Sequence, residues 1–212
     1  MRIEGLGETA SLALYNGTIL HGVQFLSPGR NHQTTTYYTP ESGVGREILA
    51  IQHPVRRIGI IGLGVGTLAA YAKPGDLFRF YEINPLVMEV AKTNFNFLNN
   101  CEGTVELVPG DARIALGREA PQRFDLLALD AFDGRVIPVH LLTREAFALY
   151  AQHLAPEGVI AVHATSKCSH GLSNRRLDRE KCPHDNQSAR RAAACDGINL
   201  DRLARSSASA ER

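Results

Sequence analysis

Hydrophobic positions from residue 57 onward fall into short runs that alternate with amphipathic stretches. Five apolar runs have the length of buried strands, and the segments between them place apolar residues every three or four positions. The predicted strands cover residues 57–63, 77–83, 104–111, 124–132 and 158–165, and the predicted helices cover residues 66–73, 85–98, 112–119 and 143–154. Strands that alternate with helices predict an α/β fold, with a parallel sheet covered by helices on both faces.

A small β-rich region is predicted before this domain. Residues 11–26 form two strand-like runs around Asn16-Gly17, a dipeptide that is the strongest short hairpin signal in a sequence. A loop-rich stretch follows, and a predicted helix at residues 45–53 ends before Pro54. We therefore expect a β-hairpin region at residues 1–53 and the α/β domain at residues 54–166.

Residues 167–212 differ from the rest of the chain. They hold three of the four cysteines, no aromatic residue and a net charge of +4 before histidines are counted. Their few large aliphatic residues bury too little apolar surface to offset the entropy lost on ordering. We expect this segment to be a disordered tail outside the domain.

Composition narrows the classes of partner. The chain has 212 residues, a formal net charge of +1 and 44% hydrophobic residues, which is typical of a soluble protein and indicates neither a nucleic-acid nor a membrane partner. No apolar run reaches the roughly 18 residues of a membrane helix, and no charged leader precedes an apolar stretch. A cytoplasmic location is the resulting expectation.

Three glycines, Gly62, Gly64 and Gly66, link the first predicted strand to its helix. A triphosphate loop would continue with Gly-Lys-Ser/Thr, and no lysine follows here. A dinucleotide site would place a third glycine at the sixth position, where Thr67 stands. The remaining interpretation is a site of the S-adenosylmethionine type, which needs backbone room rather than a pyrophosphate cradle. A simple tight turn is the structural alternative.

Acidic residues follow the next three predicted strands. Glu82 ends the second strand, where a carboxylate can hold both ribose hydroxyls, and Asp111 closes the third, near the expected place of an adenine. Open α/β sheets bind ligands at the carboxyl ends of their strands. Asp130 and Asp133 follow the fourth strand, where two carboxylates could hold a cationic amine and one could accept its proton. The alternatives are a helix cap for Asp111 and a plain turn for Asp133.

Residues 12–165 resemble the polyamine aminopropyltransferase (spermidine synthase) family, and within it the bacterial spermidine synthase-like domains. The resemblance rests on IGIIGLGVGTLA, FYEINPLVMEVA, VELVPGDAR, DLLALDAFDGRVIPVHLLT and the N-terminal NGTILHGVQFL. It implies a Rossmann-like, methyltransferase-type parallel sheet. It also implies aminopropyl transfer from decarboxylated S-adenosylmethionine to a polyamine such as putrescine, without a metal, in a protein that often dimerises.

The resemblance also implies roles for individual residues. Asp130 would be the base that deprotonates the attacking amine, and Asp133 would hold the acceptor. Glu82 would hold the ribose, and Asp111 with Ala112 the adenine. Gln24 and Tyr38 would be gate residues at the acceptor site, with Tyr37 as the competing tyrosine.

Two departures from the family pattern keep other functions open. The family's glycine loop carries an acidic residue that meets the cationic end of the decarboxylated donor, whereas this chain has Val65 at that point of a loop one residue shorter. The tail lacks the family's last strands, so we expect an incomplete sheet and weakened activity. The alternatives are a methyltransferase that uses ordinary S-adenosylmethionine and a non-catalytic ligand-binding or interaction module.

Overall fold

The computed structural model describes residues 1–5, 7, 10–16, 19–132 and 137–163. Backbone contacts divide the chain into Met1–Thr165 and Ser166–Arg212. The predicted tail at residues 167–212 lies outside the described residues, and the predicted boundary at residue 53 falls inside the first unit. The limits of the domains stay predictions.

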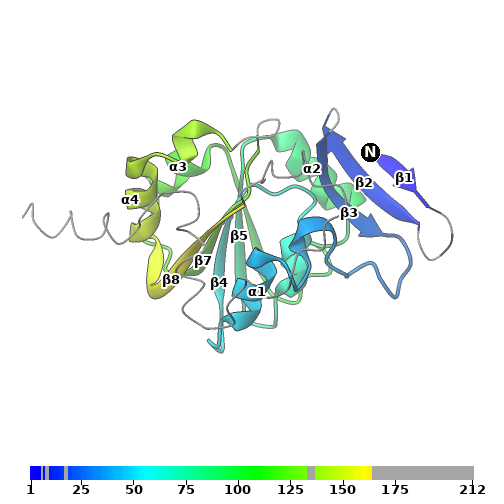
Figure 1. Cartoon of the computed structure of the whole chain (residues 1–212), viewed down its shortest axis with the longest axis horizontal. Helices are drawn as coiled ribbons and strands as arrows, with labels where there is room; N and C mark the ends of the chain where they lie inside the picture. The colour runs from blue at the N-terminus through cyan, green and yellow to red at the C-terminus, as the bar shows by residue number, and fades with distance from the viewer. Residues whose placement is uncertain (6, 8–9, 17–18, 133–136, 164–212) are drawn as a thin grey trace, which may run out of the picture. The chain divides into compact units, whose positions relative to one another are not determined.

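Five parallel strands form the central sheet, as the apolar runs predicted. They are β4 (Arg57–Ile61), β5 (Leu77–Glu82), β6 (Thr104–Pro109), β7 (Phe124–Leu129) and β8 (Leu154–Val162). Their order is β6-β5-β4-β7-β8, and Figure 1 shows β4, β5 and β7 side by side at its centre. Ile60 of β4 aligns with Phe80 of β5 and Ala128 of β7. The order reverses between β4 and β7, and such a switch point is where ligands bind in open α/β sheets.

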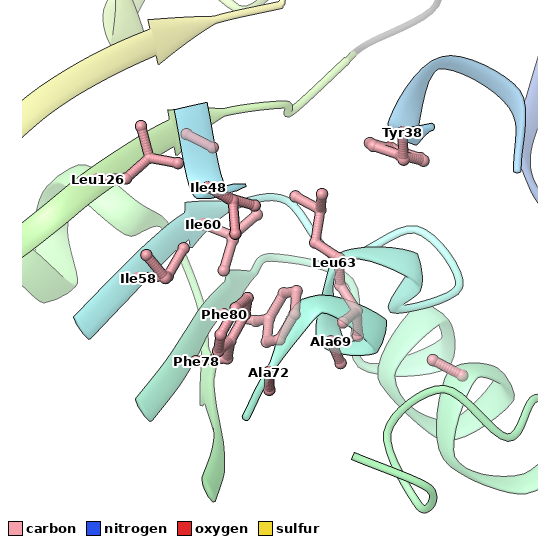
Figure 2. Close-up of a cluster of buried hydrophobic side chains, with 13 residues drawn as sticks. Tyr38, Ile48, Ile58, Ile60, Leu63, Ala69, Ala72, Phe78, Phe80 and Leu126 are labelled. Atoms are coloured by element: carbon pink, nitrogen blue, oxygen red, sulfur yellow. The ribbon is translucent and has the colours of Figure 1, made fainter. Parts of the chain in front are cut away.

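Helices pack on both faces of this sheet, because neighbouring strand residues point to opposite faces. Ile58, Ile60 and Phe80 pack in one apolar cluster with side chains of α1 (Gly43–Ala50), the 3₁₀ helix η3 (Thr67–Tyr71) and α2 (Pro85–Asn94). Figure 2 shows this cluster. Ile61, Tyr81 and Leu127 pack on the other face with side chains of α3 (Ala112–Leu116), the 3₁₀ helix η4 (Val139–Leu141) and α4 (Arg144–Gln152).

The N-terminal region contains the predicted hairpin and one further strand. β2 (Ser11–Asn16) and β3 (Ile19–Phe25) pair antiparallel, and β1 (Arg2–Glu4) adds to the free edge of β2. The short 3₁₀ helix η2 (Thr36–Tyr38) follows in the stretch predicted as loop. The three-residue β1 lies below the length at which a hydrophobic period can be recognised.

Local signals placed the starts of α2, α3 and α4 correctly. Pro85 occupies the first turn of α2, and the Thr143 side chain caps α4 by accepting a hydrogen bond from the Ala146 amide. The ends of α1, α2 and α3 lie three or four residues before the predicted ones, and two further elements differ more. The helix expected at residues 66–73 is only the short η3, and β8 begins at 154 because its first residues pair with β7 before a register shift that accommodates Pro156.

A buried ion pair holds the N-terminal end of β4. Arg56 and Asp76 are 2% and 1% exposed, and Arg56 Nη2 lies 2.5 Å from Asp76 Oδ2. The same guanidinium donates to the carbonyls of Ile48 in α1 and Tyr71 in η3. A single side chain therefore ties α1, η3 and the start of the sheet together.

A candidate active site at the carboxyl edge of the sheet

The carboxyl ends of all five parallel strands carry polar groups or glycines. Gly62 follows β4, Glu82 ends β5, Asp111 follows β6, Asp130 follows β7 and His163 follows β8. Backbone hydrogen bonds extend the sheet to this edge. Gly62 N donates to the Tyr81 carbonyl, Asp130 N to the Ile61 carbonyl and His163 N to the Leu129 carbonyl. The predicted site residues that follow neighbouring strands are therefore brought to one edge.

The three loop glycines all have positive φ, at 102° for Gly62, 56° for Gly64 and 81° for Gly66. A Cβ at Gly62 would lie 2.5 Å from the carbonyl oxygen of Asp130, and one at Gly64 would lie 2.6 Å from that of His21. These distances are too short for any side chain. The glycines thus let the loop pass closely between the end of β7 and the N-terminal hairpin.

Glu82 braces the glycine loop. Its Oε2 accepts a hydrogen bond from the Leu63 amide at 3.0 Å, and its Oε1 accepts one from the Asn84 amide at 2.8 Å. Each carboxylate oxygen has a second lone pair that remains available to a hydroxyl group. The carboxylate therefore joins β4 and β5 at the sheet edge, where the sequence predicted ribose binding.

Asp111 caps α3, as the structural alternative proposed. Its Oδ1 accepts from the Ile114 amide at 3.0 Å, and its Oδ2 lies 2.9 Å from His140 Nε2. Ala112 is the buried first residue of this helix. Arg113 donates to the His140 carbonyl, so η4 is fixed against the start of α3. Asp111 thus uses one carboxylate oxygen for the cap and the other for His140, and its contact with an adenine stays a prediction.

Asp130 is held from two sides. The Tyr38 hydroxyl donates a short hydrogen bond to Oδ2, and His163 Nδ1 lies 2.6 Å from Oδ1. The Asp130 side chain is 10% exposed. Burial, followed by the negative charge of Asp130, raises the pKa of Tyr38 well above its ordinary value. Tyr38 therefore stays a neutral donor to this carboxylate at physiological pH.

Aromatic rings surround the His163 imidazole. Its centroid lies 4.6 Å from that of Tyr37 and 5.0 Å from that of Phe132. Burial, with a smaller contribution from the charge of Asp130, also raises the pKa of Tyr37. The Tyr37 hydroxyl donates to the Leu20 carbonyl in β3. Tyr37 and Tyr38 thus both border the site, but Tyr38 contacts the carboxylate.

Gln24 lies in β3 with its side-chain amide committed to backbone groups. Its Nε2 donates to the Asn31 carbonyl at 2.6 Å, and its Oε1 accepts from the Asn96 amide at 2.9 Å. The side chain is buried, and these bonds join the hairpin to two loops. A substrate-binding role for Gln24 stays a prediction. Asp133 lies outside the described residues, so its predicted contact with the acceptor also stays a prediction.

Val65, which the sequence interpretation placed at the position of the family's acidic residue, has a buried side chain. Its side chain is 1% exposed and packs with Phe95 and Phe97 in an apolar cluster that also includes Leu12 and Leu14 of the hairpin. A carboxylate at this position would enter that apolar cluster. The shorter loop therefore lacks the acidic group altogether, and Val65 is a core residue.

Sequence reasoning missed His163 and His140 as partners of the predicted carboxylates. A usable signal was present for His163. The rule that chemistry gathers at carboxyl ends of parallel strands was applied to the first four strands but not to the fifth, which His163 follows. His140 carries no such signal, because only tertiary contact brings η4 to Asp111.

The described part of the chain shows neither a candidate membrane helix nor a candidate metal site. None of its helices has the length and apolar character needed to cross a membrane. No cluster of three or more His, Cys, Asp or Glu side chains is arranged there to hold a metal ion.

The sequence of this chain is similar to that of a known polyamine aminopropyltransferase. Over 115 residues the chain is 37% identical to a polyamine aminopropyltransferase of Vibrio vulnificus, and the match covers 52% of this chain. The predicted resemblance to the polyamine aminopropyltransferase family is confirmed. The aligned part spans only 38% of that aminopropyltransferase. No protein-family model matches this chain.

Two further matches concern the fold and the alternative function. A probable spermidine synthase of Corynebacterium glutamicum superposes with a TM-score of 0.52 and 19% identity, covering 76% of this chain and 62% of the other. This match agrees with the predicted Rossmann-like sheet with its N-terminal hairpin. An N-terminal histidine N-methyltransferase of Emericella nidulans is 34% identical over 109 residues, which is 49% of this chain and 19% of the relative.

Proposed function

We propose that this chain is a transferase that moves an aminopropyl group from decarboxylated S-adenosylmethionine to a polyamine acceptor such as putrescine. The observation that carries the proposal is the Asp130 carboxylate, which is 10% exposed and held by Tyr38 and His163 at the switch point of the sheet. The aminopropyltransferase similarity supports the reaction class.

The residues at the edge suit an adenosyl ligand of the S-adenosylmethionine type. The glycine loop supplies backbone room, and the Glu82 carboxylate keeps lone pairs for ribose hydroxyls. Thr67 offers a second indication, because its buried Oγ1 has no hydrogen-bond partner among the described residues. Asp111 and Ala112 would border the adenine. The bound sulfonium would supply the activated carbon for transfer.

The chain's own residues would prepare the acceptor. A polyamine nitrogen is protonated at neutral pH, and it must lose a proton before it can attack a carbon. A carboxylate attracts the cationic amine to the site, and a basic group receives its proton. Asp130, with Tyr38 and His163 bound to its two oxygens, is the acidic centre to which such an amine would be drawn.

One observation favours a second candidate, an S-adenosylmethionine-dependent methyltransferase of a small molecule. With Val65 buried in an apolar cluster, the glycine loop holds no carboxylate that would repel the carboxylate of ordinary S-adenosylmethionine. The similarity to a histidine N-methyltransferase agrees with this alternative. Formation of a homodimer stays a prediction under either function.

Titration calorimetry with three ligands tests the proposal. The purified chain would receive S-adenosylmethionine, its decarboxylated form and methylthioadenosine, and transfer to putrescine would be followed by mass spectrometry. Preferential binding of the decarboxylated form with spermidine formation supports aminopropyl transfer. Equal binding of both donors without spermidine favours the methyltransferase, and no binding favours a non-catalytic module.

Asp130→Asn separates chemistry from donor binding. We expect transfer to fall at least about 100-fold, because the carboxylate that draws the cationic amine to the site is lost, while donor affinity changes little. Glu157→Gln, which changes an exposed carboxylate, is the matched control. Unchanged turnover in Asp130→Asn would exclude Asp130 from the chemistry.

A further inference from the structure

His163 and Asp130 form a hydrogen-bonded pair at the ends of β8 and β7, and the direction of this hydrogen bond can be inferred. An ionised carboxylate can only accept hydrogen bonds, so the 2.6 Å contact requires His163 Nδ1 to carry a proton. Tyr38 occupies the other carboxylate oxygen as a donor. The contact therefore fixes the neutral imidazole in the tautomer whose Nε2 holds a lone pair.

The Nε2 atom of His163 is the open basic position of this pair. It has no hydrogen-bond partner among the described residues, and the side chain is 26% exposed. The ring is flanked by Tyr37 and Phe132, which limit its rotation. Among the described residues, the titratable groups that face it are Asp130 and Tyr37, with Tyr38 reaching it through Asp130.

Asp130 is less suited than His163 to receive a proton. Both of its oxygens already accept a hydrogen bond, so protonation would disturb at least one of them. An imidazole is ordinarily a much stronger base than a carboxylate, and its protonation falls near neutral pH, where general-base catalysis is most effective. The arrangement matches the logic of catalytic triads, in which a carboxylate orients the histidine that carries the proton.

We propose that His163 takes the proton from the acceptor amine, and that Asp130 is the positioning residue that orients it. The inference rests on the proposed aminopropyl transfer. The acceptor nitrogen forms the new C–N bond, the C–S bond of the donor breaks and leaves its electron pair on sulfur, and the proton lost by nitrogen passes to Nε2 of His163. The products are the extended polyamine, a neutral thioether and an imidazolium.

Nitrogen-15 NMR of the histidine side chains tests the pair without any substrate. The proposal expects the Nδ1-protonated tautomer of His163 in the native chain at a pH where the ring is neutral, and loss of this preference in Asp130→Asn. An Nε2-protonated ring in the native chain would overturn the proposal, because its basic atom would then face Asp130.

The kinetics of aminopropyl transfer test whether His163 is the general base. His163→Gln should lower kcat about 100-fold or more with a smaller change in KM, and remove the ascending limb of the pH profile. His163→Ala should recover part of its activity when imidazole is added. The matched control is His53→Gln, since His53 makes a similar 2.7 Å contact with Asp125 at the opposite end of the strands. Donor affinity, measured by calorimetry, shows whether each variant keeps a folded site.

The outcomes separate this proposal from the proposed function. If native chain transfers the aminopropyl group and His163→Gln keeps activity within about threefold with an unchanged pH profile, the base assignment is wrong and the function stands. If the native chain transfers nothing, the proposed function fails and the base assignment falls with it. The NMR tautomer then still reports whether the Asp130–His163 pair exists.

Discussion

At the scale of single residues, Tyr37 and Tyr38 are neighbours in sequence with different partners. Tyr38 donates to Asp130, whereas Tyr37 donates to the Leu20 carbonyl. Tyr38→Phe keeps the ring but leaves one carboxylate oxygen without its donor. Because a hydrogen bond to a charged group contributes about 1.5–3 kcal/mol, we expect transfer to fall roughly 10- to 100-fold.

Steady-state kinetics of both phenylalanine variants measure this difference. Tyr37→Phe should lose less activity than Tyr38→Phe, because its hydroxyl binds a backbone group at the rim. The reverse order would assign the gate tyrosine to Tyr37. Calorimetry with methylthioadenosine should give similar affinities for both variants.

A second prediction at this scale concerns Val65. Val65→Asp would bury an unpaired charge among Phe95, Phe97 and the hairpin, and we expect it to lower the free energy of unfolding by at least about 3 kcal/mol. Val65→Ala, which removes only apolar contacts, should cost less. Urea unfolding followed by circular dichroism measures both. A stable Val65→Asp with sharpened preference for the decarboxylated donor would show that this side chain faces the donor after all.

At the scale of elements, the Gln24 amide links β3 to the loops at Asn31 and Asn96. Gln24→Ala would leave two backbone groups without their buried partner, at a cost of about 1–3 kcal/mol for each unsatisfied group. Gln24→Glu can still accept from the Asn96 amide but cannot donate to the Asn31 carbonyl. Its loss of stability should therefore come from the Asn31 bond alone, whereas alanine loses both bonds. We expect both to reduce the midpoint of thermal unfolding.

Hydrogen exchange shows where this loss acts. Faster exchange of backbone amides confined to β2 and β3 would show that the Gln24 side chain stabilises the attachment of the hairpin to the two loops. If Gln24→Ala unfolds like the native chain but has a raised KM for the polyamine, Gln24 is a substrate-binding residue, as the family resemblance implies.

At the scale of the whole molecule, the Arg56–Asp76 pair joins three elements. Burial alone raises the pKa of Asp76, but the hydrogen bonds from Arg56 and the backbone amides of Lys73 and Arg56 outweigh it and lower the pKa. A lowered pKa in the folded state stabilises the fold above the ordinary aspartate range, near pH 4, and this contribution is lost as the pH falls through the folded-state pKa.

Asp76→Asn should therefore destabilise the chain by about 3–5 kcal/mol at pH 7, since it leaves the buried guanidinium without its counter-charge. The difference from the native chain should begin to shrink below about pH 4, where the carboxylate of the unfolded chain takes up a proton, and it should be lost once the pH falls through the lowered pKa of the folded state. Urea unfolding at several pH values measures it, with Glu157→Gln as an exposed control. A difference that stays constant down to pH 3 would contradict the ion-pair account.

Sequence patterns predicted features that depend on local order. The period of apolar residues located the five strands, and the rule for parallel sheets brought Glu82, Asp111 and Asp130 to one edge. Features that depend on tertiary contact were missed or misread. Val65 is buried because the hairpin and the segment with Phe95 and Phe97 pack against it, and His140 meets Asp111 only because η4 folds back onto α3. The family resemblance could not reveal the burial of Val65, because the glycine loop of this chain is shorter than that of the family pattern.

The close approach of Gly22 to Val65 has a consequence for any attempt to recombine this chain with its relatives. A Cβ at Gly22 would collide with both methyl groups of Val65. The hairpin and the glycine loop are therefore not interchangeable parts, and a hairpin grafted from a relative with a larger residue at this point would need a smaller residue at position 65 as well. Two segments 43 positions apart must change together.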